Sequence, residues 1–401
     1  MSLTRRTLLL GAAASAIPAA AAAPLVFTVR LDMLNKQEDP SWQWFHPRPV
    51  WVPGYGALIT VQKHLMTSDH YSGLYTMTSR DFGRTWDSPR EIAELAWRRD
   101  GDVDVAVADV TPGYLRDARR VLAVGAQVRY SRAGKQLEDR PKAHQTAYAV
   151  MDPKSGAWST WQTLQMPDEP RFNYARSACA QWLELRDGTV LLPMYYGPNA
   201  RDPFSVTVAR FRLVDGRRLE FIGYGSEHKL GDVRGLVEPS LARYAGRYFL
   251  TVRNDLRAYV TAGADGLDFH ELKPWLFDDG AELGSYNTQQ HWLAHSDGLF
   301  LSYTRRGANN DHVMRHRAPL FVAQVDPASL RVIRATERVL MPEHGATYGN
   351  FGAAAMSKDE SWVTDVEGMF GPEPRKRGAE GRMYLARVEW ARPNRDWDRL
   401  A

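Results

Sequence analysis

One eight-residue segment constrains the fold of this chain more than any other. Residues 79–86 read Ser-Arg-Asp-Phe-Gly-Arg-Thr-Trp. Asp81 can accept hydrogen bonds from nearby backbone N–H groups, as aspartate does in tight turns. Gly83 allows a positive φ angle, and Trp86 can fill the apolar space beneath a hairpin. Together with Ser79, these residues predict a structural turn that joins two outer strands of a sheet and carries no chemistry itself.

Short apolar segments recur along the rest of the chain, separated by turn signals. Asp-Gly dipeptides, which favour tight turns, occur at 187–188, 215–216, 265–266, 279–280 and 297–298. No long helical periodicity stands out. The pattern is typical of an all-β propeller, sandwich or barrel, with strands expected at 24–29, 56–62, 74–78, 120–125, 147–151, 189–195, 205–211, 248–252, 299–303, 320–325 and 383–388. The strand around residues 382–390 is expected to pair with early strands, which would close the arrangement.

Charge and cysteine content exclude several classes of protein. The 401 residues carry a net charge of +4, spread evenly and without a long basic run. We therefore expect no nucleic-acid partner. The preference for arginine over lysine suits the binding of carboxylates. Cys179 is the single cysteine; it excludes an intrachain disulfide, and its apolar neighbours predict a buried small side chain.

The first 23 residues have the composition of a targeting segment. Arg5 and Arg6 precede Leu8-Leu9-Leu10 and an alanine-rich run that ends at residues 21–23, before Pro24. This arrangement predicts a twin-arginine export signal over residues 1–23 and a periplasmic or secreted protein. The apolar run is short, so we expect no stable membrane anchor. Residues 24–401 show no linker and are predicted to form a single domain.

The segment Ser79-x-Asp81-x-Gly83-x-x-Trp86 resembles the Asp-box, or BNR repeat, of the sialidase (neuraminidase) superfamily. Residues 262–269 resemble a degenerate second box, with Phe269 in the position of the tryptophan. This resemblance implies a β-propeller of four-stranded antiparallel blades. Six blades are favoured, and seven are the alternative.

The resemblance also implies a set of site residues, in the order in which sialidases present them. Phe45-His46-Pro47-Arg48-Pro49 is similar to the motif that carries the first substrate-binding arginine. The residues that match the later positions are Asp69 in a loop before the box, Glu238, Arg253, Arg317 with Arg306 and Arg315 as rivals, and Tyr348.

These residue types suit the cleavage of a terminal acidic sugar of the sialic-acid kind. Arginines that converge on one carboxylate form charge-assisted, bidentate hydrogen bonds. Asp69 would protonate the leaving oxygen, and Glu238 would deprotonate Tyr348, because sialidases use a tyrosine nucleophile. We expect Arg48, Arg253 and Arg317 to bind the substrate, together with His46, His64, Gln290 and His291.

Two other functions stay open. His46 occupies a position where sialidases have no histidine, and related propellers include lyases and rhamnosidases that act on uronate-containing polysaccharides. In such an enzyme His46 or His64, with Tyr130 or Tyr286, would serve as the base. The third possibility is a propeller that binds acidic carbohydrate without catalysis. We expect no cofactor and no metal, since adjacent Asp311 and His312 rarely chelate one ion together.

Overall fold

The computed structural model describes residues 24–37, 39–66, 69–137 and 145–399. The predicted export signal over residues 1–23 lies outside this part of the chain and stays a prediction. No helix among the described residues is both long and apolar enough to span a membrane.

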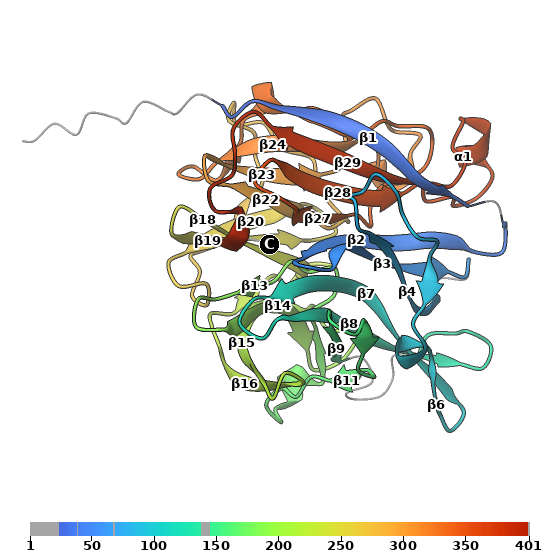
Figure 1. Cartoon of the computed structure of the whole chain (residues 1–401). Helices are drawn as coiled ribbons and strands as arrows, with labels where there is room; N and C mark the ends of the chain where they lie inside the picture. The colour runs from blue at the N-terminus through green and yellow to red at the C-terminus, as the bar shows by residue number, and fades with distance from the viewer. Residues whose placement is uncertain (1–23, 38, 67–68, 138–144, 400–401) are drawn as a thin grey trace, which may run out of the picture.

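The described strands form six antiparallel sheets, which are arranged around one axis as the blades of a propeller (Figure 1). The innermost strands of neighbouring blades contact one another, β2 with β7, β18 with β22, β22 with β27, and β27 with β2. The predicted fold class is therefore confirmed, with six blades and not seven. From the axis outward, the first blade consists of β2 (Gln43–Val52), β3 (Gly56–His64), β4 (Tyr71–Ser79) and β5 (Arg90–Glu91).

The other blades follow in chain order. The second has β7 (Val103–Leu115), β8 (Arg120–Ser131), β9 (Thr146–Asp152), β10 (Ala157–Trp158) and β11 (Gln162–Thr163), with β6 (Arg98–Asp100) beside β7. The third has β12 (Tyr174–Arg176) and β13 (Leu183–Glu184), then β14 (Thr189–Gly197), β15 (Ser205–Val214), β16 (Arg218–Tyr224) and β17 (His228–Lys229). The fourth has β18 (Val237–Tyr244), β19 (Arg247–Arg253), β20 (Tyr259–Gly263) and β21 (Lys273–Pro274).

The fifth blade has β22 (His291–His295), β23 (Gly298–Tyr303), β24 (Leu320–Asp326), β25 (Arg331–Val332) and β26 (Arg338–Met341). The sixth has β27 (Gly352–Ala355), β28 (Glu360–Val366) and β29 (Arg382–Trp390). A short helix, α1 (Glu373–Lys376), lies in the loop between β28 and β29.

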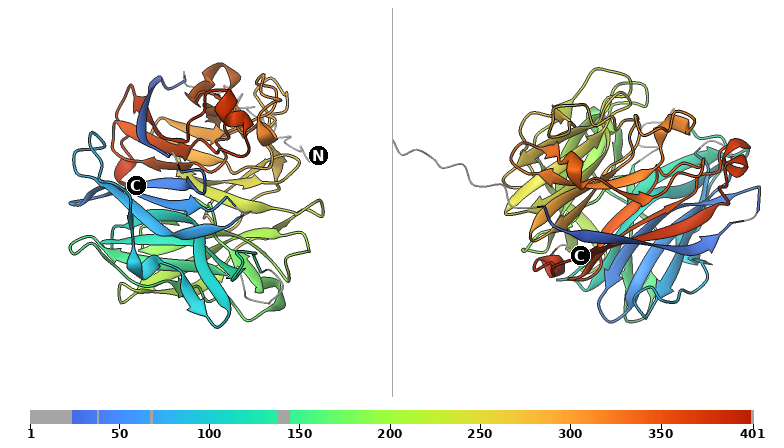
Figure 2. Two further views of the ribbon diagram at one scale, coloured as in Figure 1. Left: turned by 90° about the vertical axis from the view of Figure 1, so that its right-hand side faces the viewer. Right: turned by 90° about the horizontal axis from the view of Figure 1, so that it is seen from above.

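The ring closes through strands from the two ends of the described chain. β1 (Phe27–Lys36) pairs with β29 in antiparallel register, from Phe27 opposite Trp390 to Lys36 opposite Arg382. The blue strand β1 lies beside the red strand β29 in Figure 1 and in both views of Figure 2. This confirms the prediction that the strand around residues 382–390 pairs with an early strand. It leaves the sixth blade made from both ends, which removes an open edge.

The hydrophobic core lies between neighbouring blades, because each blade is apolar on both faces. β14, for example, is buried along its whole length. Val190 and Leu192 pack with residues of β8 and β9 from the second blade, and Leu191 packs with residues of β18 and β19 from the fourth. Middle strands with continuous apolar character are expected when a sheet is covered on both sides.

The turn at residues 79–86 joins the two outer strands of the first blade, as predicted. Asp81 Oδ1 accepts hydrogen bonds from the backbone N–H groups of Arg84 at 3.1 Å and Thr85 at 2.9 Å. Gly83 has φ 77°. The same kind of turn recurs at residues 262–269, where Asp265 accepts the N–H groups of Leu267 and Asp268.

The position of Trp86 differs from the prediction. It is only partly buried, and its ring packs against Trp362 of the sixth blade at 6.0 Å instead of filling only its own hairpin. Arg387, also in the sixth blade, donates hydrogen bonds to the carbonyls of Phe82 at 3.1 Å and Gly83 at 2.8 Å. The turn therefore fastens the first blade to the sixth.

Candidate functional site

The inner segments of five blades each present one non-glycine residue with a positive φ angle near the axis. These residues are His46, Asp109, Cys179, Glu238 and Asn287, with φ between 46° and 58°. In β2, β7 and β18 they lie at β-bulges, where the register with the next strand shifts. Left-handed backbone at a residue with a side chain costs about 1–3 kcal/mol and clusters at functional sites. The bulges turn these side chains toward one another.

Arg253 and Arg317 lie on either side of Asn287. Arg253 Nη1 donates to Glu238 Oε1 at 2.6 Å, and its Nη2 donates to Asn287 Oδ1 at 2.6 Å. Arg317 Nη2 donates to the Asn287 carbonyl at 2.5 Å. A Cβ atom on Gly349 would lie 2.4 Å from Arg317 Cδ, so only glycine leaves room for this side chain. The structure thus brings together three of the residues predicted from the sequence.

Arg48 lies deeper along the axis and is bound to neutral groups. Its Nη2 donates to Gln289 Oε1 at 3.0 Å, and its Nη1 lies 3.1 Å from His291 Nε2. Because arginine only donates, Nε2 must accept, and the proton of His291 resides on Nδ1, 2.8 Å from Ser240 Oγ. Burial, followed by the charge of Arg48, lowers the pKa of His291 well below its usual value. His291 is therefore a neutral support for Arg48.

Positive charge at the axis is only partly compensated. The Nε atoms of Arg48, Arg253 and Arg317 are all buried without a hydrogen-bond partner among the described residues. Burial, and then the nearby charge of Arg253, lowers the pKa of Arg317 to about 9. Within the described part of the chain no carboxylate lies within salt-bridge distance of Arg317. The rival arginines Arg306 and Arg315 are exposed. An anionic ligand would supply the missing charge.

Asp69 lies beside Tyr71 and Tyr130. Asp69 is exposed, and its Oδ1 accepts a hydrogen bond from the Tyr71 hydroxyl at 3.4 Å. The hydroxyl of Tyr130 donates to the Asp69 carbonyl at 2.8 Å, which positions the loop. Burial raises the pKa of Tyr71 well above its usual value, and Asp69 and Asp109 add to this effect. Asp69 is thus the carboxyl group with the freest access to solvent at the site.

Asp109 and His46 form a second pair. His46 Nε2 lies 2.9 Å from Asp109 Oδ1 and 3.3 Å from Asn350 Oδ1. Burial by itself raises the pKa of Asp109, but His46 and Arg48 outweigh it and hold that pKa at about 2. Asp109 is therefore an ionised carboxylate at neutral pH, beside the arginines.

Three further residues of the site were not predicted from the sequence: Asp365, Tyr195 and Arg176. Asp365 lies near Arg48 and Arg317, and burial raises its pKa to about 8 despite these charges. Tyr195 lies near Glu238, and its hydroxyl is hydrogen-bonded to Arg176. Burial raises the pKa of Tyr195 to about 12. Asp365 and Tyr195 lie on β28 and β14, the second strands of their blades, and Arg176 lies on the short inner strand β12. No motif marks these residues in the sequence.

The structure does not bring all predicted residues to the arginines. Tyr348 packs in the core between the fifth and sixth blades. Burial, followed by the charge of Glu367 and not of Glu238, raises the pKa of its hydroxyl above its usual value. Gln290 binds Ser285, Thr288 and Thr251 within its own surroundings, and the neighbouring Gln289 contacts Arg48 instead. His64 packs against the rings of Phe45, Tyr71 and Phe370 at the wall of the site.

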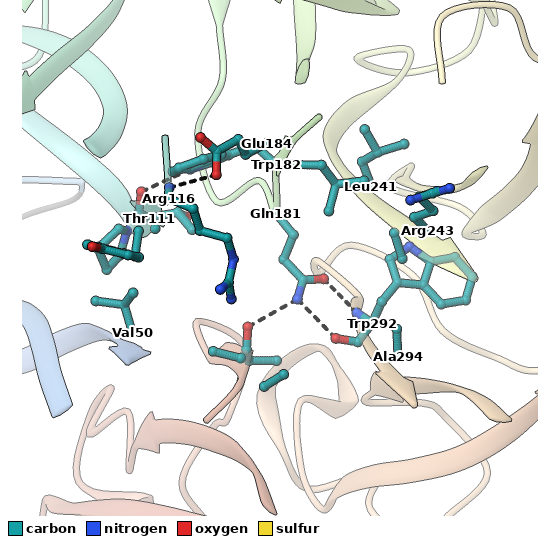
Figure 3. A pocket seen from close by; sticks show the side chains of 18 of the residues that line it. Val50, Thr111, Arg116, Gln181, Trp182, Glu184, Leu241, Arg243, Trp292 and Ala294 are labelled. Atoms are coloured by element: carbon teal, nitrogen blue, oxygen red, sulfur yellow. Dashed lines mark hydrogen bonds between the residues drawn. The ribbon is translucent and has the colours of Figure 1, made fainter. Parts of the chain in front are cut away.

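A cavity of about 450 Å³, here called the rear cavity, lies at the other end of the axis (Figure 3). Arg48 reaches this cavity from the site, and on every blade the other lining residues of the inner strands follow the residues of the site along the chain: 49–51, 111–114, 181–187, 241–243, 292–294 and 352–355. Gln181 forms its floor. Its side chain accepts from Trp292 N at 2.6 Å and donates to the carbonyls of Trp292 and Ala353 at 3.0 and 3.1 Å. Gln181 thus ties three blades together between the two ends.

Comparison with known proteins supports the fold. No protein-family model matches the chain, and no curated protein sequence matches it. A protein of unknown function from Dyadobacter fermentans has a TM-score of 0.64 at 16% identity, over 90% of this chain and 99% of that one. Trypanosoma rangeli sialidase has a TM-score of 0.62 at 12% identity, over 90% of this chain and 59% of that one. This chain therefore spans about three fifths of the length of that sialidase.

The NanB sialidase of Streptococcus pneumoniae is also similar, with a TM-score of 0.57 at 10% identity, over 90% of this chain and 70% of that one. At such identities the likeness establishes the fold alone. The chain is a six-bladed β-propeller with a sialidase-like fold.

Proposed function

We propose that this protein is a glycoside hydrolase that removes a terminal acidic sugar from a glycan. One observation carries the proposal: Arg48 and Arg317 are buried at the axis, bind only neutral acceptors and leave their Nε atoms unpartnered. A buried charge without a partner is costly, and a sugar carboxylate would provide one through charge-assisted hydrogen bonds. In agreement, the similar T. rangeli sialidase has been solved in complex with sialic acid.

In this proposal Arg48, Arg253 and Arg317 bind the substrate carboxylate, each with an Nε that has no partner among the described residues. Asp69, the exposed carboxyl group, protonates the leaving oxygen. Glu238 acts as base toward a phenol, as expected from the sequence, but the phenol beside it is Tyr195 and not Tyr348. Arg176, hydrogen-bonded to Tyr195, would stabilise the phenolate as its proton leaves. The proposed nucleophile is thus Tyr195, on β14.

The proposal is tested with the purified protein on a panel of sialosides and uronate-containing oligosaccharides. We expect release of a free acidic monosaccharide, with a loss of rate of about 1,000-fold in Tyr195→Phe and Glu238→Gln. Tyr348→Phe is the matched control and should retain most of the activity. Equal losses in Tyr195→Phe and Tyr348→Phe would contradict the assignment of the nucleophile, and no released sugar would contradict the proposal.

A second candidate function, a lyase on uronate-containing polysaccharide, is favoured by the position of His46. Its Nδ1 is buried and has no hydrogen-bond partner among the described residues, and its ring lies 5.2 Å from that of Tyr71. The same arginines would neutralise the uronate carboxylate while His46 removes the adjacent proton. A 4,5-unsaturated product, detected by its ultraviolet absorbance, would establish this reaction. Binding of the same sugars without any product would leave a carbohydrate-binding propeller.

A further inference from the structure

We propose that His46, Asp109 and Cys179 form a binding site for one divalent transition-metal ion of the zinc class. One ring nitrogen, one carboxylate oxygen and the thiol sulfur of these residues all lie within 4.8 Å of one another. The three side chains come from three successive blades. From the sequence we expected no metal; this proposal instead gives the chain one metal site.

The backbone directs these three side chains to one point. Each residue has a positive φ angle, 53° for His46, 58° for Asp109 and 53° for Cys179. The backbone N–H of Cys179 also donates to the Asp109 carbonyl at 3.1 Å, which fixes the second and third blades relative to each other. Strained backbone that is repeated on three blades at the same level is typical of a preformed site. The ligand atoms are therefore held together before any ion binds.

The donor set suits zinc or a related ion. Imidazole nitrogen, carboxylate oxygen and thiolate sulfur bind zinc at about 2.0–2.3 Å. Tetrahedral ligands at these distances lie roughly 3.3–3.8 Å apart, so the present arrangement, with 2.9 Å between His46 Nε2 and Asp109 Oδ1, needs only small shifts. Three protein ligands leave a fourth position for water or a substrate oxygen, as in catalytic zinc sites.

The charges balance when the ion is bound. His46 and Cys179 are 2% and 3% exposed, and the Asp109 carboxylate receives hydrogen bonds from both side chains in the present structure. A divalent ion would replace the thiol proton, which leaves to solvent, and would bind the thiolate, the carboxylate and a neutral imidazole. Two negative charges then compensate the ion. Arg48 is a positive charge that also acts on Asp109. Its Nη atoms are held by Gln289 and His291.

His46 offers an additional sign of an incomplete site. Its Nδ1 is buried without a hydrogen-bond partner in the described part of the chain. Buried polar atoms of native proteins are normally satisfied by protein, water or an ion. An ion bound at Nε2 would displace the ring proton to Nδ1, which can take it up because no donor among the described residues occupies it.

The test is metal binding by the full-length protein, read out independently of any enzyme activity. Protein treated with EDTA is incubated with Zn²⁺, separated from free ion and measured by mass spectrometry of the metal. We expect one Zn²⁺ per chain and release of about one proton per ion at pH 7, measured by calorimetry in two buffers. With Co²⁺ in place of Zn²⁺, a thiolate-to-metal charge-transfer band should appear.

Variants locate the site. Cys179→Ser keeps the size of the side chain and should remove the charge-transfer band and weaken Zn²⁺ binding at least 100-fold, as should Asp109→Asn. His312→Gln is the matched control, because His312 also pairs with a carboxylate, Glu343 at 3.1 Å, but with no third ligand. Thermal melting verifies that each variant is folded. Uptake below about a tenth of an equivalent, or uptake that Cys179→Ser and Asp109→Asn leave unchanged, would overturn the proposal.

Discussion

The two ends of the propeller axis are built from the same six inner strands, yet they differ in chemistry. At one end lie buried arginines, carboxylates and strained bulge residues, several of which lack hydrogen-bond partners. At the other end lies the rear cavity of about 450 Å³, whose floor residue Gln181 has its hydrogen bonds satisfied. A well-formed cavity and a concentration of buried charge therefore lie at different ends of the same axis. Uncompensated charge and backbone strain are the features on which the proposed function rests, and both lie at the arginine end.

The largest expected effect tests the charged end. Arg317→Met should reduce kcat/KM on the acidic substrate by about 100-fold or more, because a charge-assisted contact to the sugar carboxylate is lost. Stability should not fall, since replacing a buried charge by an apolar side chain is often neutral or stabilising. Enzyme kinetics and urea unfolding measure the two effects, and Arg315→Met, at an exposed neighbour, is the control. A variant that is unstable but active would contradict this view of Arg317.

The second prediction concerns the boundary between the two ends. Gln181→Ala should lower the free energy of unfolding by about 2–3 kcal/mol, because the amide of Trp292 and the carbonyls of Trp292 and Ala353 lose their partner inside the protein. Urea unfolding measures this loss. Gln165→Ala, at an exposed glutamine, should change stability by less than about 0.5 kcal/mol. Equal effects of the two substitutions would show that Gln181 does not join the blades.

The third prediction is a pH dependence at the charged end. Burial raises the pKa of Asp365 to about 8, whereas the unfolded chain loses this proton near pH 4. The folded protein therefore holds an extra proton between these values, and its free energy of unfolding falls as the pH rises toward 8. Asp365→Asn should flatten this fall by at most about 1.4 kcal/mol per pH unit, the slope for one proton.

Urea unfolding at pH 5 and pH 8 checks this prediction. Asp102→Asn, at a fully exposed side chain, is the control and should leave the pH dependence unchanged. The same slope in Asp365→Asn and in the wild type would mean that Asp365 is already ionised in the folded protein.

The smallest expected effect tests the rear cavity. Arg186 is exposed at its rim, and Arg186→Ala should change kcat/KM by less than about twofold and stability by less than about 0.5 kcal/mol. Kinetics on the same substrate provide the measurement. A large loss of activity in Arg186→Ala would show that the rear cavity also takes part in the reaction.

Parts of the fold follow from the sequence because they depend on local patterns. The turn around Asp81 and Gly83, the second and third strands of the blades and the ring closure through residues 382–390 were predictable from spacing and apolar character. The innermost strands were not among the predicted ones. They carry polar residues and bulges, so neither alternation nor a continuous apolar run marks them. The strands that carry the bulge residues His46, Asp109 and Glu238 are therefore those with the weakest sequence pattern.

Some residues of the site could be named from the sequence, and others could be found only in the structure. Glu238, Arg253, Arg317 and Asp69 could be named because their order along the chain resembles that of sialidases. Tyr348 could not be placed correctly by order alone, because only packing puts its ring into the core between blades. Asp365 and Tyr195 became visible only when middle strands brought them beside the arginines and Glu238.

By itself, the sequence determined an all-β chain with regular turns, because turn residues and apolar periodicity act over a few neighbouring residues. Only the tertiary structure decided which side chains meet at the axis. His46, Asp109 and Cys179 lie on three successive blades, and their ligand atoms come within 4.8 Å of one another only because these blades pack side by side around the axis. The physical reason is that burial, charge compensation and backbone strain at the axis depend on all six blades together, and no short stretch of sequence records them.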